Sequence, residues 1–100
     1  MPVKFIHWRY VFLEVEGGHD PNKLIDIFRS FFGIYSYSIS GLRLVDIIDN
    51  IAIYAVSSRY VPQLVAASVI YSELYGEKIL LRGVAPTLKS GKKIYLPSGE

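Results

Sequence analysis

The sequence has no cysteine, only two histidines and a single tryptophan among its 100 residues. The absence of cysteine excludes a disulfide framework, a thiolate metal site and a cysteine nucleophile, and it fits an intracellular protein. His7 and His19 have no neighbours at metal-ligand spacing, so we interpret them as surface or loop residues. We therefore expect no cofactor bound by the chain itself.

Long hydrophobic runs are also absent. Residues 60–72, an uncharged run as long as any in the chain, contain proline, glutamine and serine and are fewer than the roughly 20 residues that span a bilayer. The N-terminus lacks the apolar core of a signal peptide, which predicts a soluble, cytoplasmic protein. With 51% hydrophobic and 20% charged residues, we predict one packed domain over residues 1–100, with a basic C-terminal extension at 85–100.

No group of polar residues has a spacing typical of catalysis. Asp46 and Asp49 are separated by two isoleucines, so they flank a predicted turn rather than form an acid/base pair. Ser-Gly-Lys-Lys at 90–93 lacks the upstream glycine of a phosphate-binding loop, and the serines within 36–40 have no base partner. An acylphosphatase-like site would need an arginine in the loop at 17–20, which instead contains an acid. The sequence predicts no active site of its own.

Positive charge is scarce in most of the chain and concentrated at its end. Residues 1–77 contain six Lys/Arg and eight Asp/Glu, whereas residues 78–100 contain five Lys/Arg and one Glu, so the net charges are −2 and +4. A basic end of this kind indicates contact with an anion such as a phosphate backbone, and a solubilising tail is the alternative.

The first half of the chain predicts a strand, a helix and a second strand. Alternation at 8–16 places Val11, Leu13 and Val15 on one face of the strand, and the other face receives Tyr10 and Phe12. A helix is predicted from Asp20 as N-cap and Pro21 to Gly33 as C-terminal cap, with an apolar stripe. That stripe consists of Leu24, Ile27, Phe28 and Phe31. Residues 41–48 predict the second strand.

The second half predicts a strand, a helix and a strand again. Asp49-Asn50 is typical of a tight turn, so we expect strand 51–57 to form a hairpin with the preceding one. A helix is predicted from Ser58 as N-cap to Gly76, followed by a strand at 78–84. This helix carries no charge between Arg59 and Glu73, so we expect both of its sides to meet apolar surfaces or a partner.

This order predicts an α+β, ferredoxin-like (βαββαβ) fold with two helices on one face of a four-stranded antiparallel sheet. The open face receives Tyr10 and Phe12, together with either Tyr54 and Val56 or Ile51, Ile53 and Ala55. We expect another chain or the C-terminal segment to cover it. Strand 51–57 has one tyrosine and no basic residue, so RNA bases are not expected to stack on it.

Several short motifs follow one another in the chain. They are Arg9-Tyr10-Val11, residues 51–56, Arg59-Tyr60-Val61, Leu64 with Ala66-Ala67, residues 76–82 and Thr87-Leu88-Lys89. In this order and spacing they resemble the archaeal and eukaryotic ribonuclease P protein component 2 family, over roughly residues 8–93. One departure is Ala85-Pro86-Thr87, where the family has a Ser-Gly-Thr-like step; a proline there changes the path of the basic segment.

The resemblance implies a non-catalytic protein subunit of ribonuclease P, the ribonucleoprotein that removes 5′ leaders from precursor tRNA. In that family the RNA performs the chemistry with Mg²⁺, and the subunit pairs with ribonuclease P protein component 3 and self-associates. The alternative is a ferredoxin-like protein-interaction or small-ligand regulatory domain with no RNA role.

The resemblance also implies two sets of contact residues. The expected RNA-backbone contacts are Arg82, Lys89, Lys92 and Lys93, with Arg9 and Arg59 as further candidates for which a structural role is the alternative. The expected protein contacts, on the second helix and the open sheet face, are Tyr10, Phe12, Tyr54, Leu64 and Tyr71.

Overall fold

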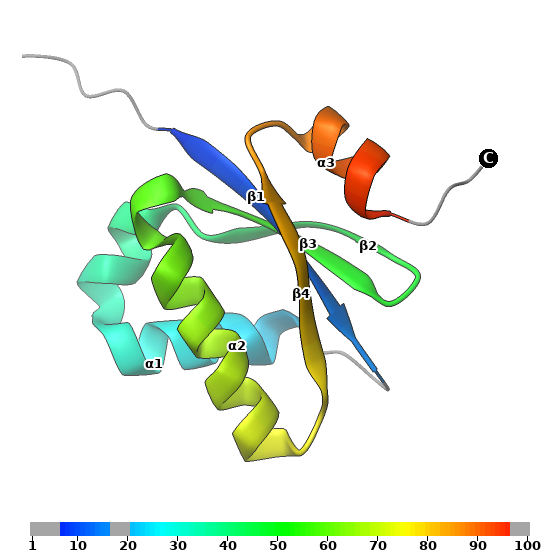
Figure 1. Ribbon diagram of the computed structural model, residues 1–100. Coiled ribbons are helices and arrows are strands. Elements are labelled where there is room, and N and C mark those ends of the chain that lie inside the picture. The colour runs from blue at the N-terminus through cyan, green and yellow to red at the C-terminus, as the bar shows by residue number, and fades with distance from the viewer. Residues whose placement is uncertain (1–6, 17–20, 97–100) are drawn as a thin grey trace, which may run out of the picture.

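The computed structural model describes residues 7–16 and 21–96 (Figure 1). The elements in chain order are β1 (Trp8–Val15), α1 (Pro21–Ser40), β2 (Arg43–Ile48), β3 (Ile51–Ser57), a short 3₁₀ helix (Ser58–Tyr60), α2 (Val61–Tyr75), β4 (Ile79–Ala85) and α3 (Leu88–Tyr95). The predicted N-cap Asp20 and the rest of the loop at 17–20 lie outside the described residues.

The four strands form one antiparallel sheet in the order β2-β3-β1-β4, so the predicted ferredoxin-like α+β fold is confirmed. β2 and β3 form the predicted hairpin, in which Asp49 takes a positive φ of 54°; aspartate tolerates this conformation better than most residues. The central strands β3 and β1 are paired along most of their length, and β2 and β4 are the edges.

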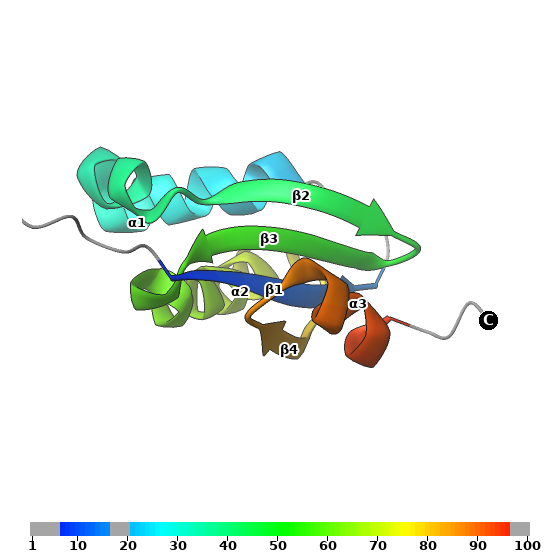
Figure 2. The ribbon, with the colours of Figure 1, turned by 90° about the horizontal axis from the view of Figure 1, so that it is seen from above.

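α1 and α2 pack side by side on one face of the sheet, as Figure 2 shows from above. The core between helices and sheet contains Val11 and Leu13 of β1 and Tyr54 and Val56 of β3, all fully buried. The predicted faces of β1 are therefore confirmed. The sequence left two registers for β3, and the pairing of Phe12 with Ile53 selects the one with Ile51, Ile53 and Ala55 on the opposite face.

Gly33 does not end the first helix, which corrects the predicted C-terminal cap. It has φ 92° and ψ 160°, a non-helical conformation that joins two helical segments of α1. Only glycine adopts this region of φ/ψ space readily, so Gly33 is a kink from which a second segment runs to Ser40. The serine- and tyrosine-rich residues after Gly33 are thus helical.

The predicted limits of the second helix hold at its C-terminus but not at its N-terminus. Gly76 is the C-cap, with a left-handed φ of 67°, and its N–H donates to the Ser72 carbonyl oxygen at 2.9 Å. Ser58 is not the N-cap, because residues 58–60 form a 3₁₀ turn and α2 begins at Val61 with no side-chain cap. Pro62 lies in the first turn of α2, where its missing N–H is tolerated.

α3 covers part of the sheet face opposite α1 and α2 (Figure 2). Beneath it lies a second apolar cluster whose buried members are Phe12, Ile51, Ile53 and Ala85. The Tyr95 ring packs 5.5 Å from the Phe12 ring, centroid to centroid. Of the two predicted coverings for this face, the C-terminal segment is the one observed.

Candidate nucleic-acid and protein interfaces

α3 carries three of the predicted RNA-contact lysines. Its N-cap is Thr87, whose Oγ1 accepts a hydrogen bond from the Ser90 N–H at 3.2 Å, so the helix starts directly after Pro86. Gly91 is buried against the sheet, whereas Lys89 and Lys93 are exposed. Because these two lysines are four residues apart on a helix, their side chains project from the same side. In the described part of the chain, neither makes an ion pair.

Two other predicted basic contacts are engaged by carboxylates of the same chain. Lys92 Nζ lies 3.9 Å from Asp46 Oδ2, and Arg82 Nη1 lies 3.1 Å from Glu14 Oε1. Arg82 is located at the register shift between β1 and β4, where the ladder moves from Phe12–Gly83 to Leu13–Leu81. Both ion pairs are substantially exposed, so each contributes little to stability and a stronger anion can compete for the cation.

The remaining predicted cations lie on other elements. Arg9 is half-buried at the start of β1, and its guanidinium donates to the Trp8 carbonyl oxygen at 2.9 Å. Arg59 is exposed in the 3₁₀ turn before α2. A third arginine that the sequence did not single out, Arg43 on β2, lies over the Trp8 ring, with its guanidinium carbon 4.9 Å from the ring centroid.

Most of the predicted protein contacts are inside the domain. Tyr54, Leu64 and Tyr71 are buried in the core between the helices and the sheet, and Phe12 is buried beneath α3. These four assignments are corrected, because side chains without exposed surface cannot meet a partner in this fold. Tyr10, which packs against the α3-side cluster, is half-buried and keeps some exposed surface.

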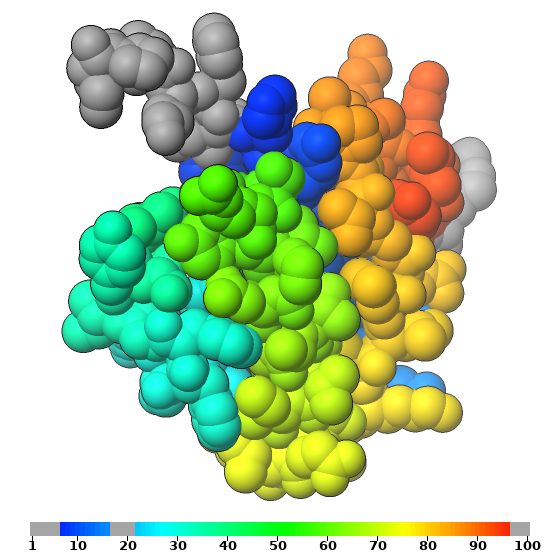
Figure 3. Space-filling model, turned by 60° about the vertical axis from the view of Figure 1, so that its left-hand side comes forward, coloured from blue at the N-terminus to red at the C-terminus, as the bar shows by residue number. Residues whose placement is uncertain are grey.

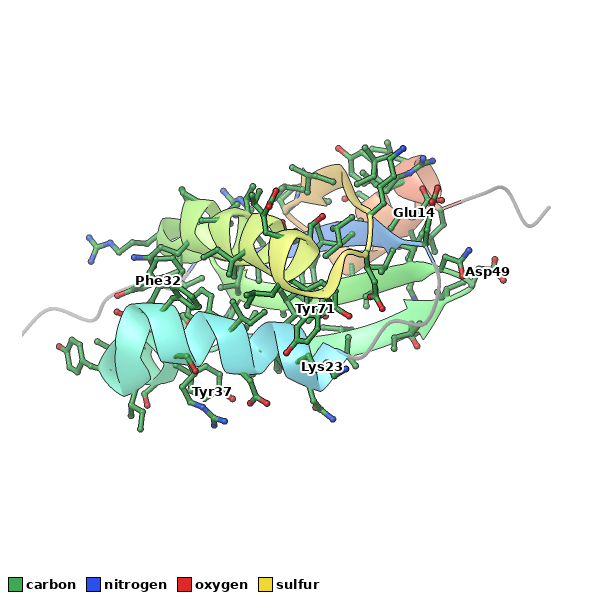
Figure 4. All side chains as sticks on the ribbon, turned by 90° about the horizontal axis from the view of Figure 1, so that it is seen from below. Glu14, Lys23, Phe32, Tyr37, Asp49 and Tyr71 are labelled. Carbon is green, nitrogen blue, oxygen red and sulfur yellow. The ribbon has the colours of Figure 1, made fainter. Side chains whose placement is uncertain are left out.

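Tyr71 has a structural role at the contact between α1 and α2 (Figure 4). Its hydroxyl donates to Glu77 Oε1 at 2.7 Å, and its ring packs 4.9 Å from the Tyr75 ring. Across the same contact, Lys23 of α1 lies over the Tyr75 ring, with Nζ 4.8 Å from its centroid. This set of contacts ties the end of α2 to the start of α1.

Most of the exposed large apolar side chains in the described residues lie on α1 and α2, which Figure 3 shows side by side; the others are Ile47, Leu80, Leu81 and Ile94. The large ones on these two helices are Phe31, Ile34, Tyr35, Ile39, Val69, Leu74 and Tyr75. On α2, Pro62, Ala66 and Val69 are exposed at successive turns, so its solvent side is apolar as well as its core side. The apolar surface of α2 was predictable from the lack of charge between Arg59 and Glu73. Its continuation on α1 was not predictable, because serines alternate with the apolar residues after Gly33.

No group of three or more metal-binding side chains occurs within residues 7–16 and 21–96. Over the same residues, no helix is long and apolar enough to cross a membrane. The chain matches no protein-family model, and no curated protein is significantly similar to it.

Proposed function

We propose that the chain is a non-catalytic protein subunit of ribonuclease P, which supports RNA-catalysed removal of 5′ leaders from precursor tRNA. The proposal joins the resemblance of the short motifs to the ferredoxin-like fold and to the charged surface on α3. The Mg²⁺ that the reaction uses would belong to the RNA, and ribonuclease P protein component 3 would be the protein partner.

The observation that carries the RNA role is the position of Lys89 and Lys93. Apolar residues on the sheet side of α3 hold the helix in place, and the two lysines project from it without a carboxylate partner in the described structure. Lysines held in this way bind phosphates as point charges without reading base sequence. Lys92 and Arg82 would add to the same contact once RNA phosphates replace Asp46 and Glu14.

The exposed apolar surface of α1 and α2 supports a protein partner. Side chains such as Phe31, Ile34 and Val69 are more than half exposed, and apolar patches of this kind mark interaction sites in soluble proteins. We assign the contact with ribonuclease P protein component 3 to this surface. This surface replaces the predicted protein contacts that are buried in the structure, which are Phe12, Tyr54, Leu64 and Tyr71.

A second candidate function is a protein-interaction or small-ligand regulatory domain without an RNA role. It is favoured by the two ion pairs, Arg82–Glu14 and Lys92–Asp46, which neutralise half of the four cations on β4 and α3. The two candidates differ in a measurable property, because only the RNA subunit requires a salt-dependent affinity for RNA.

The test is a salt titration of binding to ribonuclease P RNA. We expect the double variant Lys89→Gln/Lys93→Gln to reduce the slope of log affinity against log salt by about 1.4 to 1.8, for the loss of two phosphate contacts. The matched control is Lys23→Gln/Arg29→Gln, which removes the same charge from α1 and should leave the slope unchanged. Equal slopes for both variants would show that α3 does not contact the RNA. If the wild type does not bind RNA at all, the second candidate function is favoured.

A further inference from the structure

Trp8 and Arg43 form a pair on the part of the open sheet face beyond α3. In the ladder, Trp8 is opposite Ser57 and Arg43 is opposite Ala55. Ser57 and Ala55 are alternate residues of β3, on the same face as the buried Ile53, so Trp8 and Arg43 share that face. The cluster beneath α3 includes neither of them. The Arg43 guanidinium therefore stacks over the Trp8 ring in the region that α3 leaves uncovered.

Two more arginines lie at this end of the sheet. Arg9 follows Trp8 directly and donates to its carbonyl oxygen at 2.9 Å. Arg59 follows the end of β3, and the neighbouring Ser58 N–H donates to the His7 carbonyl oxygen at 2.7 Å, which holds the 3₁₀ turn beside the start of β1. Arg9, however, is opposite Val56, which is buried in the core beneath α1 and α2, so its side chain leaves β1 on the face opposite Trp8 and Arg43. The contact that defines the site is therefore the one between Arg43 and Trp8 alone.

No carboxylate compensates these arginines in the described residues, for which ion pairs are observed only at Arg29, Arg82 and Lys92. The sequence around them is free of acids, because residues 27–45 and 50–72 contain arginine but neither Asp nor Glu. Glu14 pairs with Ile51 at the hairpin end of the sheet, and Figure 4 shows Glu14 and Asp49 toward that end. An arginine without a counterion, such as Arg43, is available to bind an anion.

The stacking of Arg43 on Trp8 prepares the guanidinium for such an anion. An arginine that lies over an aromatic ring keeps its in-plane N–H groups free, and these groups match the oxygens of a phosphate. The ring also restricts the long side chain, so less conformational entropy is lost when the anion binds. Trp8 is half-buried and its ring lies against Gly41, so the support for the guanidinium is itself fixed.

We infer that Arg43, stacked on Trp8, is a second phosphate-binding site for the RNA backbone, separate from the lysines of α3. This inference rests on the proposed RNA role. It adds Arg43 and Trp8, which had no assigned role. Trp8 holds the guanidinium and is a positioning residue, whereas Arg43 contacts phosphate.

Arg29 provides a matched control within the same chain. Its guanidinium also lies near an aromatic ring, 5.5 Å from the Tyr37 centroid, but its Nη2 is 2.8 Å from Asp26 Oδ1. The two arginines carry the same charge and make similar ring contacts. They differ in that the Arg29 guanidinium forms an ion pair with a carboxylate. Replacing Arg29 should therefore affect RNA binding much less than replacing Arg43.

The experiment uses Trp8 as its own reporter, because it is the only tryptophan in the chain. A short, unstructured, uridine-rich RNA is titrated into the full-length protein while tryptophan emission and fluorescence anisotropy of labelled RNA are recorded. We expect RNA to change the Trp8 emission. Arg43→Ala should weaken binding about tenfold, as expected for a lost hydrogen bond to a charged group, and lower the salt slope by about 0.7. Arg43→Lys should keep the slope but lose part of the affinity, because an ammonium group cannot bind bidentately.

Three results would overturn the inference, and they differ in what else they affect. RNA binding that is equally strong in Arg43→Ala and Arg29→Ala, with unchanged Trp8 emission, would remove this site but leave the α3 contact intact. A response to inorganic phosphate, at constant ionic strength, as large as the response to RNA would identify a small-anion site instead. No RNA binding by the wild type would remove both the site and the proposed RNA role.

Discussion

Gly91 of α3 lies against the ring of Phe12 on β1, so closely that a methyl group on its Cα would overlap the ring. The same methyl group would be 2.9 Å from the Ala85 Cβ. Glycine weakens a helix interior, yet here it allows α3 to approach the sheet and bury the apolar face. The position of the basic residues on α3 therefore depends on the absence of a side chain at one residue.

Gly91→Ala should destabilise the protein even though alanine is the better helix former. Relief of the overlap with Phe12 requires α3 to shift away from the sheet, and overpacking of this kind costs about 1–3 kcal/mol, more than the gain of about 1 kcal/mol from helix propensity. Urea denaturation measures the free energy of unfolding. Lys93→Ala, on the exposed side of the same helix, should change it by less than about 0.5 kcal/mol. A Gly91→Ala variant more stable than the wild type would show that α3 does not pack as described.

The two helix glycines with positive φ should respond differently to asparagine. Gly76 has φ 67° and ψ 19°, within the left-handed region that asparagine tolerates, whereas Gly33 has φ 92° and ψ 160°, outside it. A Cβ would meet nothing within 4 Å at either position, so only backbone strain differs. We expect Gly76→Asn to be nearly neutral and Gly33→Asn to cost about 1–3 kcal/mol in thermal or urea unfolding. Equal costs at both positions would argue against the kink in α1.

Removal of the intramolecular acids should strengthen RNA binding. Asp46→Asn frees Lys92 and Glu14→Gln frees Arg82, and exposed pairs of this kind are worth about 0.2–1 kcal/mol. Each substitution should therefore raise the affinity for ribonuclease P RNA by about 1.5- to 5-fold at low salt, as measured by fluorescence anisotropy. Glu73→Gln on α2, which removes the same negative charge from another element, is the control. If all three variants bind equally, the ion pairs do not limit RNA binding.

Tyr71→Phe should loosen the end of α2 without disturbing the rest of the core. The substitution keeps the buried ring and removes the 2.7 Å hydrogen bond to Glu77 Oε1; hydrogen bonds to charged groups contribute about 1.5–3 kcal/mol. Native-state hydrogen exchange should show faster exchange in the last turn of α2 than in β3. A uniform change across the domain would instead indicate that Tyr71 supports global stability.

Much of the fold is predictable because the periodic patterns are clear. The alternation of β1 fixes which face Val11 and Leu13 occupy, and Gly76 marks the end of α2. β3 is different, since residues 51–56 are apolar and buried at every position. The sequence pattern of β3 therefore does not show which of its residues face the helices. Only the pairing with β1 places Tyr54 in the core.

The candidate sites are harder to predict from the sequence than the fold is. α3 is a short, lysine-rich helix with an internal glycine, and its stability depends on a contact with Phe12, which is distant in the chain. The pair formed by Trp8 and Arg43 joins β1 to β2, which are not neighbours in the sheet. No local pattern reports such contacts. Charge counting located the basic C-terminal segment but did not identify the Trp8–Arg43 pair for this reason.

The most direct measurement of the central claim is cleavage of precursor tRNA by ribonuclease P RNA at limiting Mg²⁺. The reaction is assembled with ribonuclease P protein component 3 and either the wild-type chain, Lys89→Gln/Lys93→Gln or the α1 control Lys23→Gln/Arg29→Gln. We predict that the wild type and the control co-purify with component 3 and stimulate cleavage, and that the α3 variant co-purifies but stimulates less. Failure of the wild-type chain to stimulate cleavage or to co-purify would contradict the assignment to ribonuclease P.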